Sequence, residues 1–372
     1  MKSPVKAPFP ILCLLLALGA AGCQKSDSTL KIGLAGVQTG SDGQIGTTMF
    51  YGSQIAIDEW NEKGGLLGKK IVAVSRDDEG KPNQAVAVAQ ELVSEGVAAV
   101  IGHFNSGCTI PASEIYQQNG ILQITPGSTN PTVTERGFRS LFRIVGRDDQ
   151  QGVVAARYAR DTLKAGTIAV LHNKTAYGQG LAEEVKKTFE ALGGKVGFFA
   201  GISGEEMDFR ATLSAVRASG AQAVFWGGMY GQAGPLLVQL RDGGSDMPFL
   251  SGDGTIMQEF LNTAGNKASG VYLTFGPDFQ QIPAAKGFLE KYRARFGPEG
   301  PYSIYGYEAA NVLFQAMAAA GTTEAAKVAE VLRSKTFETS LGPVSFDEKG
   351  DLRQTNYIIW TVQDGKFVPA AP

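Results

Sequence analysis

Short apolar runs alternate with longer amphipathic segments from about residue 30 to residue 275. A run of four to eight apolar residues between turn residues predicts a buried strand, and apolar positions three or four apart predict a helix. Strands are expected at residues 30–36, 71–75, 97–101, 121–124, 167–171, 195–199, 221–226, 248–251 and 270–275. Helices are expected at residues 47–62, 83–94, 111–119, 150–163, 181–192, 209–218 and 236–241. Because strand and helix alternate without a break, the pattern predicts parallel sheets with right-handed crossovers, in two rounds that divide near Arg147.

The pattern changes after residue 275. Three successive helices are expected at residues 285–296, 304–320 and 323–334, and two strands at residues 342–346 and 357–362. The polar sequence DEKGD lies between these two strands. A turn between two alternating runs predicts a β-hairpin.

Residues 101–132 contain two strand–loop–helix units whose loops are rich in Gly, Ser, Thr and Asn. Pro111 is expected to open the first helix, and Gly120 to close it. Parallel sheets bind ligands at the carboxyl ends of their strands, where such loops gather and helix N-termini present free N–H groups. The stretch therefore predicts half of a site for a small anionic or zwitterionic group.

Composition narrows the class of protein. A chain of 372 residues suits two domains of ordinary size. Its formal charge of −2 argues against a nucleic-acid partner, which would need a basic face. The 48 glycines fit a fold with many strand–helix turns better than a helical bundle.

The residues that usually carry catalysis are sparse. His103 and His172 lie far apart, no carboxylate cluster has metal-ligand spacing, and no phosphate-binding loop occurs, so no metal and no cofactor are expected. Cys108 follows His103 by five residues, so a thiol–imidazole nucleophile is an alternative to a small, half-buried cysteine in a tight loop. The carboxylates at residues 77–79 and 148–149 are interpreted as solvated loop charges or helix N-caps. Binding is therefore favoured over catalysis.

The N-terminus has the pattern of a targeting signal. Lys2 and Lys6 precede an apolar segment at residues 11–18, which is too short to span a bilayer as a helix. The small residues that lead to Cys23 resemble a bacterial lipoprotein signal, with Cys23 as the lipidated first residue, although Ala20 stands where such signals usually have Leu. An ordinary secretory signal is the alternative. Residues 1–23 are thus expected to be the signal and residues 24–29 a polar tether.

Two motifs resemble a known family. The pattern GH-x-x-S-x-x-T-x-PAS at residues 102–113 and IL-x-I-x-P-x-x-TNP at residues 121–131 are similar to the branched-chain amino-acid-binding proteins of bacterial ABC transporters, the Leu/Ile/Val-binding family of type I periplasmic binding proteins. The resemblance covers nearly all of the chain after residue 30. It implies an α/β fold of two doubly wound parallel-sheet lobes joined by a hinge of several crossovers. The implied divisions are residues 30–147 for lobe 1, 148–275 for lobe 2, 276–355 for a return to lobe 1 and 356–372 for a return to lobe 2.

An amino acid needs partners for a carboxylate, an ammonium and a side chain, and the strand-end loops contain all three kinds. By the resemblance, the hydroxyls of Ser106 and Thr129 hold the ligand carboxylate, and the backbone carbonyl of Gly127 receives the ammonium. Tyr177 closes over the ligand, and Asp253 neutralises the ammonium.

Two further candidates line the pocket for the ligand side chain. They are Met229 and Tyr302, and simple packing is an equal alternative for both. Ser106 and Thr129 could instead cap helices, and Asp253 between two glycines could be a turn residue.

The sequence departs from the family at positions that bear on the ligand. Met229 stands where familiar leucine binders have a tyrosine, Ile45 where they have an aromatic, and Asp253 where they have a glutamate. Gly80 and Asn105 occupy the positions of a family disulfide. These changes leave amino-acid binding better supported than leucine specificity.

The resemblance implies a monomeric, non-enzymatic solute-binding protein of the periplasm or cell exterior, anchored to the membrane through Cys23. It is expected to capture an amino acid, in the first place Leu, Ile or Val, and to deliver it to an ABC permease and its ATPase. The alternative is a ligand-sensing receptor subunit for another small zwitterion or an amide.

Overall fold

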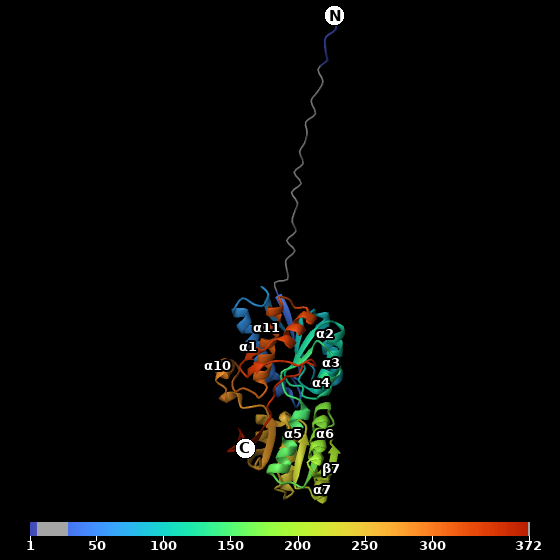
Figure 1. Ribbon diagram of the computed structural model, residues 1–372, viewed down its shortest axis with the longest axis vertical. Helices are drawn as coiled ribbons and strands as arrows, with labels where there is room; N and C mark the ends of the chain where they lie inside the picture. Colours follow the sequence, from blue (N-terminus) through green and yellow to red (C-terminus); the bar gives the residue numbers. More distant parts are fainter. Residues whose placement is uncertain (6–28, 371–372) are drawn as a thin grey trace.

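The computed structural model describes residues 1–5 and 29–370. Two lobes, each built on its own sheet, lie one above the other (Figure 1). Most of the expected signal, including Cys23, and most of the expected tether fall outside the described residues.

The first lobe contains a parallel sheet of order β2-β1-β3-β4-β5. Its elements are β1 (Thr29–Gly36), α1 (Gly43–Glu62), β2 (Lys70–Asp77), α2 (Pro82–Ser94), β3 (Ala99–Gly102), α3 (Ser106–Gln118), β4 (Leu122–Thr125), α4 (Thr132–Glu135) and β5 (Leu141–Arg143). Every residue of β3 and β4 is buried, as expected for central strands that are covered by helices on both faces.

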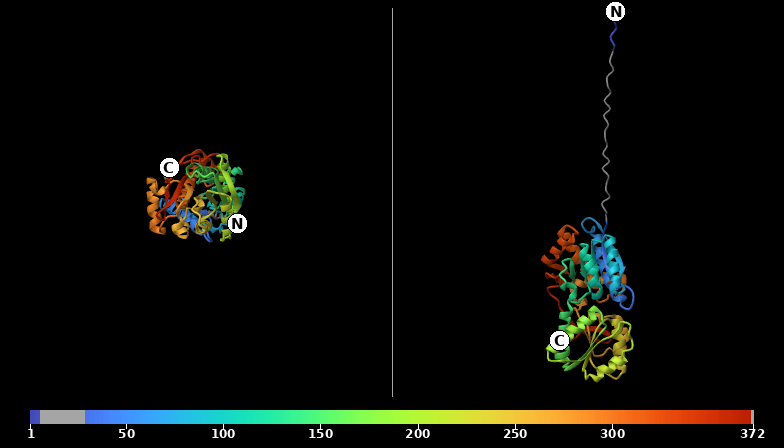
Figure 2. Two further views of the ribbon diagram at one scale, coloured as in Figure 1. Left: turned by 90° about the horizontal axis from the view of Figure 1, so that it is seen from below. Right: turned by 90° about the vertical axis from the view of Figure 1, so that its right-hand side faces the viewer.

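The second lobe contains a seven-stranded sheet of order β14-β13-β10-β9-β8-β6-β7. Its elements are α5 (Asp148–Arg157), a π-helical turn (Tyr158–Thr162), β6 (Thr167–His172), α6 (Ala176–Ala191), β7 (Lys195–Gly201), α7 (Arg210–Ala218), β8 (Ala223–Gly227), α8 (Tyr230–Asp242), β9 (Phe249–Ser251), α9 (Gln258–Ala264), β10 (Val271–Phe275), β13 (Ile358–Gln363) and β14 (Lys366–Pro369). The strands are parallel except at one edge, where β13 runs antiparallel to β10 and to β14. Figure 2 shows this twisted sheet with helices on both sides.

Between β10 and β13 the chain packs against the first lobe. This segment contains α10 (Lys286–Phe296), α11 (Ser303–Ala320), α12 (Ala325–Ser334), β11 (Phe337–Thr339) and β12 (Gly342–Val344). Helix α11 lies against α1, and the close approach depends on Gly52 and Gly306, since a Cβ at either position would overlap backbone of the other helix. The chain therefore passes between the two sheets three times, at residues 144–147, 276–277 and 353–357.

A buried ion pair fastens this returning segment to the first sheet. Arg143 in β5 is fully buried, and its Nε lies 2.6 Å from Oδ1 of Asp351. Arg147 binds the other carboxylate oxygen at 2.7 Å. The two guanidinium groups, with their hydrogen bonds, hold the pKa of Asp351 below its usual value despite its burial.

The predicted fold class is confirmed, but two local predictions are wrong. Helix α3 begins at Ser106, and Pro111 lies inside it, because the loop after β3 turns directly into the helix. The predicted hairpin between residues 342–346 and 357–362 does not form, because β12 pairs with β11 whereas β13 belongs to the sheet of the other lobe. Across DEKGD only a single antiparallel bridge joins Phe346 to Leu352. Strand β13 instead forms a hairpin with β14 through Asp364-Gly365, both of which have positive φ.

Candidate functional site

A buried polar network holds the loop after β3 in place. His103 Nδ1 lies 2.6 Å from Asp78 Oδ2, and its Nε2 lies 3.0 Å from the hydroxyl of Tyr116. The carbonyl of His103 accepts a hydrogen bond from Thr125 Oγ1 at 2.7 Å. Asp78 is fully buried, so the interpretation of residues 77–79 as solvated charges is wrong for this residue.

Cys108 also lies against this network. Its side chain is fully buried, and burial together with the charge of Asp78 raises the pKa of the thiol. The imidazole of His103 has both ring nitrogens engaged by Asp78 and Tyr116. A thiolate nucleophile activated by His103 therefore has no support in the geometry.

The loop after β4 is fixed by side chains on either side of it. Ser128 Oγ donates to the carbonyl of Phe104 at 2.9 Å, and Arg143 Nη1 donates to the carbonyls of Ser128 and Asn130 at 3.0 and 2.9 Å. Ser106 Oγ accepts a hydrogen bond from the Asn130 N–H at 3.2 Å. These contacts place Ser106, Gly127 and Thr129 in one corner of the first lobe.

The second lobe contributes a carboxylate between two phenols. Asp253 follows β9, and its Oδ1 accepts a hydrogen bond of 2.7 Å from the Tyr177 hydroxyl. Its Oδ2 accepts a hydrogen bond from the Tyr302 hydroxyl, and the Gly254 N–H donates to Tyr177 Oη at 3.0 Å. Burial raises the pKa of Asp253, although the hydroxyl donors oppose this shift. Burial and the charge of Asp253 raise the pKa values of both tyrosines, so these remain neutral donors.

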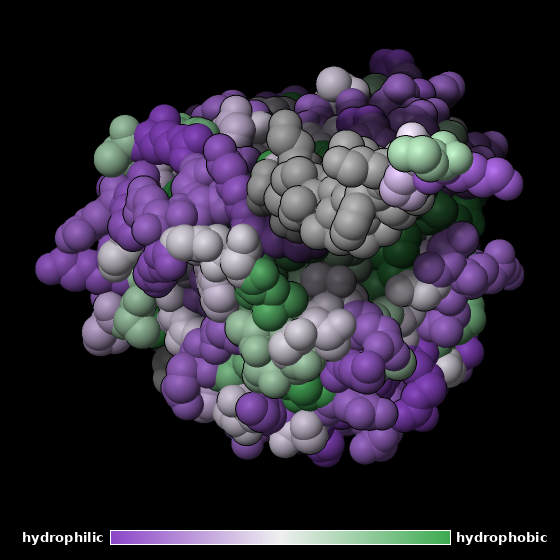
Figure 3. Space-filling view, turned by 90° about the horizontal axis from the view of Figure 1, so that it is seen from above, coloured by the Kyte–Doolittle hydropathy of each residue, from purple (hydrophilic) through white to green (hydrophobic). Residues whose placement is uncertain are grey.

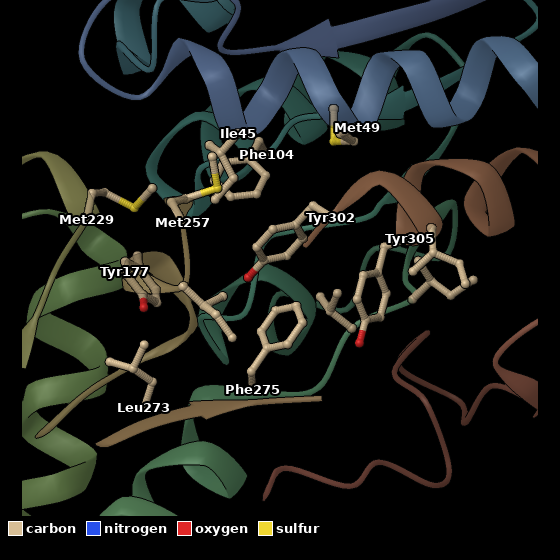
Figure 4. Packing of buried hydrophobic residues seen from close by; sticks show 14 of the residues in the cluster. Ile45, Met49, Phe104, Tyr177, Met229, Met257, Leu273, Phe275, Tyr302 and Tyr305 are labelled. Carbon is tan, nitrogen blue, oxygen red and sulfur yellow. The ribbon is translucent and has the colours of Figure 1, made fainter. Parts of the chain in front are cut away.

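These groups meet at a narrow cavity between the lobes, which encloses about 240 Å³ including the part open to solvent. The cavity is lined by Phe104, Asn105, Ser106, Gly127, Tyr177, Met229, Asp253, Gly254 and Tyr302. Figure 4 shows Tyr302 between the cluster of Tyr177, Met229 and Met257 and the ring of Tyr305. The lobes are in contact beside it, since Asn130 Nδ2 donates to the Ala176 carbonyl at the start of α6 at 2.6 Å.

Six of the seven candidate residues line this cavity, and the seventh, Thr129, does not. Thr129 is fully buried, and its hydroxyl makes no hydrogen bond of standard geometry within residues 29–370, although it is close enough to the Asp148 carboxyl to oppose the rise in the pKa of that group. A buried polar atom that is poorly satisfied is costly, so this hydroxyl, two residues from the cavity-lining Gly127, is a candidate to bind a ligand group.

Two buried polar residues near the site were not predicted. Asp148 and Gln151 at the start of α5 are fully buried, and none of their side-chain oxygens and nitrogens makes a hydrogen bond of standard geometry in the described part of the chain. Asp148 is close to the hydroxyl of Thr129, and Gln151 is close to the carboxyl of Asp253. Burial, and after it the charge of Asp253, raises the pKa of Asp148 well above its usual value. The sequence-based interpretation of Asp148 as a solvated charge or a cap is therefore wrong. The pattern alone gave no signal, because a helix-initial aspartate is ordinarily exposed.

The residues that differ from the family pattern do not all lie in the cavity. Met229 lines the cavity, whereas Ile45 is fully buried beside Phe104 and is not among the lining residues (Figure 4). A Cβ placed on Gly80 would lie 3.5 Å from Asn105 Oδ1, so the two positions expected for the family disulfide are neighbours.

Other kinds of site were sought over the described residues. Within them, no group of three or more His, Cys, Asp or Glu side chains could hold a metal ion. None of the helices described is long and apolar enough to cross a membrane. The outer end of the first lobe shows mainly hydrophilic side chains with smaller hydrophobic groups between them (Figure 3).

Comparison with known proteins places the chain in a family. The sequence profile described as periplasmic binding protein matches residues 29–366. An "Amino acid binding protein" of Pseudomonas aeruginosa is 45% identical over 341 residues, which cover 90% of this chain and 91% of the relative. "Leu/Ile/Val-binding protein homolog 1" of Brucella abortus is 41% identical over 367 residues, 97% of this chain and 98% of the relative.

A solved structure agrees with the fold. The branched-chain amino acid transporter substrate-binding protein of Streptococcus pneumoniae, in complex with isoleucine, superposes with a TM-score of 0.82 at 27% identity and covers 92% of this chain and 100% of that chain. The family resemblance drawn from the two motifs is thus confirmed. The chain belongs to the periplasmic binding protein family.

Proposed function

We propose that this protein is an extracytoplasmic solute-binding protein that captures a free amino acid between its lobes and delivers it to an ABC permease. The observation that carries the proposal is the small cavity between a carboxylate from one lobe and hydroxyls from the other. A zwitterion needs both kinds of group at once, and a site divided between two lobes supplies them only when the lobes are together.

The ligand carboxylate binds to the hydroxyls of Ser106 and Thr129. The Thr129 hydroxyl is buried and makes no hydrogen bond of standard geometry in the described chain. Ser106 Oγ already accepts a hydrogen bond, so its own proton is free to be donated. The ammonium binds between the Gly127 carbonyl and Asp253, which Tyr177 and Tyr302 hold in position.

The side chain of the ligand contacts Met229, Phe104 and the ring of Tyr302, which form the apolar part of the cavity. An aliphatic side chain suits such walls, one of the relatives named above is a Leu/Ile/Val-binding protein homolog, and the solved structure from Streptococcus pneumoniae holds isoleucine. A branched-chain amino acid is therefore the proposed ligand. A sensor of another small zwitterion or an amide is the second candidate, because Met229 and the shorter carboxylate of Asp253 reshape the pocket.

Binding acts by shifting an equilibrium between open and closed lobes. The ligand favours the closed form because only that form offers both sets of contacts. The hydrogen bond between Asn130 and Ala176 adds a contact between the lobes in this form. The permease and its ATPase then recognise the closed, monomeric receptor. No catalytic step is proposed, and the buried Cys108 serves packing.

The proposed location is the periplasm or the cell exterior, with Cys23 carrying the lipid that anchors the protein to a membrane. Support comes from the sequence alone, since Cys23 follows an apolar segment that ends in small residues. Replacing Cys23 with Ser is expected to move the protein from the membrane fraction to the soluble fraction. Retention of the Cys23→Ser variant on membranes would reject the lipid anchor.

Thermal unfolding with a panel of ligands tests the binding proposal. Ligand at a thousand times its dissociation constant stabilises the folded state by about 4 kcal/mol. Leu, Ile or Val is expected to raise the melting temperature by several degrees, while other amino acids, amides and urea have smaller effects. If only an amide or a polar amino acid raises the melting temperature, the protein is instead a sensor of another small zwitterion or an amide. If no member of the panel raises the melting temperature, amino-acid binding itself is contradicted.

A further inference from the structure

A second cavity lies on the other side of Asp253 and Tyr302. It encloses about 970 Å³, including the part open to solvent. All three connections between the lobes contribute to its walls, through residues 144–146, 276–277 and 354–357. We call it the hinge cavity. Asp253 and Tyr302 line both this cavity and the smaller one described above.

The walls of the hinge cavity combine apolar and polar surface in nearly equal parts, and Phe275, Ile282, Leu341 and Leu352 form much of the apolar part. Asp253 is the one acidic residue among the described residues that line it. No lysine or arginine of the described chain lines the cavity. A ligand carboxylate would therefore find no cationic partner there and would face the Asp253 carboxyl, whereas a cation would pair with that carboxyl.

Two tyrosine hydroxyls in the lining are free to bind a ligand. Within residues 29–370, neither Tyr305 nor Tyr357 makes a side-chain hydrogen bond. The ring of Tyr305 lies against Gly276, and that of Tyr357 against Gly146, so both are positioned by the connections themselves. The cavity thus combines apolar walls, one carboxylate and two unpaired hydroxyls.

We infer that the hinge cavity binds a primary amine with an aliphatic or aromatic body and no carboxylate. The ammonium contacts Asp253 and the tyrosine hydroxyls, and the body packs against Phe275, Ile282 and Leu352. Because Asp253 also faces the smaller cavity, an amine in the hinge cavity and the ammonium of an amino acid in the smaller cavity compete for the same carboxylate. Each ligand then weakens the other by the same factor.

The test titrates the purified protein with 3-methylbutylamine and with 2-phenylethylamine by calorimetry. Ile282 is only partly buried, so Ile282→Trp can fill the hinge cavity, and Met229→Trp fills the smaller cavity as the matched control. We expect saturable amine binding that Ile282→Trp abolishes and Met229→Trp preserves. In the wild-type protein, we also expect the amine to lower the apparent affinity for leucine.

Two outcomes would overturn the inference. One is the absence of saturable amine binding to the wild-type protein at millimolar concentration, and the other is binding that Met229→Trp abolishes but Ile282→Trp preserves. If Ile282→Trp does not fold, Tyr357→Phe replaces it and is expected to weaken amine binding about tenfold or more, the effect of one hydrogen bond to a charged group. Unchanged amine binding in Tyr357→Phe would then count against the site. The leucine titration on the same samples reports separately on the proposed amino-acid function.

Discussion

Removing the charge of Asp253 separates its role in binding from its role in folding. The side chain is 3% exposed, and its two oxygens accept hydrogen bonds from Tyr177 and Tyr302. In the proposed complex it is the charged partner of a desolvated ammonium. Loss of one partner of a buried charge pair costs about 2–5 kcal/mol, so Asp253→Asn should raise the dissociation constant about thirtyfold or more.

The stability of the ligand-free protein should not fall when Asp253 is replaced by Asn. Because burial raises the pKa of Asp253 in the folded state, the ionised carboxylate costs stability once the pH exceeds the unfolded value of 3.8. The contribution of Asp253 to the free energy of unfolding is thus most favourable at acid pH, and it is lost as the pH rises through the pKa of Asp253 in the folded protein. Asp253→Asn is therefore expected to leave the melting temperature of the ligand-free protein at pH 7 unchanged or higher.

Calorimetric titration with the amino acid that gives the largest thermal shift measures the affinity, and calorimetric unfolding measures the stability. Asp253→Glu is the matched control, since it keeps the charge. Its affinity should exceed that of Asp253→Asn. Affinity within threefold of wild type in Asp253→Asn would refute the assigned role of the carboxylate, and a large loss of ligand-free stability would refute the electrostatic reasoning.

Three further changes test other parts of the account. Asp351→Asn leaves the buried guanidinium of Arg143 without its anion and should lower the unfolding free energy by about 3–5 kcal/mol, whereas Asp208→Asn in an exposed ion pair should change it far less; equal effects in denaturant titrations would contradict this. Asp148→Asn should stabilise the ligand-free protein at pH 7 and stabilise it less at pH 4.5, because burial raises the pKa of Asp148 and the cost of the ionised group grows with pH above 3.8; a gain that does not change with pH would count against a buried carboxyl. Gly127→Ala places a methyl group against the Phe104 ring and should weaken amino-acid binding, and an unchanged affinity would show that the loop moves freely.

The alternation of strands and helices was predictable because buried parallel strands and amphipathic helices have different periods. The discontinuous course of the chain was implied only by the family resemblance, because periodicity does not distinguish residues 342–346 from residues 357–362 although they join different sheets. The Asp364-Gly365 turn carried a usable local signal for the final hairpin. Long-range pairing is set by tertiary packing, which local patterns do not record.

Most residues of the candidate site could be predicted from the two sequence motifs. Ser106 and Thr129 lie within recognisable strings, and the structure brings them to the same corner. Asp148 was missed because its burial depends on the loop of Thr129 and on the arrangement of the second lobe around Asp253. Its charge is unremarkable in sequence and becomes significant only when both lobes enclose it.

A crystal structure of the protein with its preferred amino acid would test the central claim most directly. The account predicts a ligand carboxylate within hydrogen-bond distance of Ser106 Oγ and Thr129 Oγ1, and an ammonium within that distance of Asp253 and the Gly127 carbonyl. A ligand bound elsewhere, or with its ammonium away from Asp253, would contradict the proposed division of the site between the two lobes.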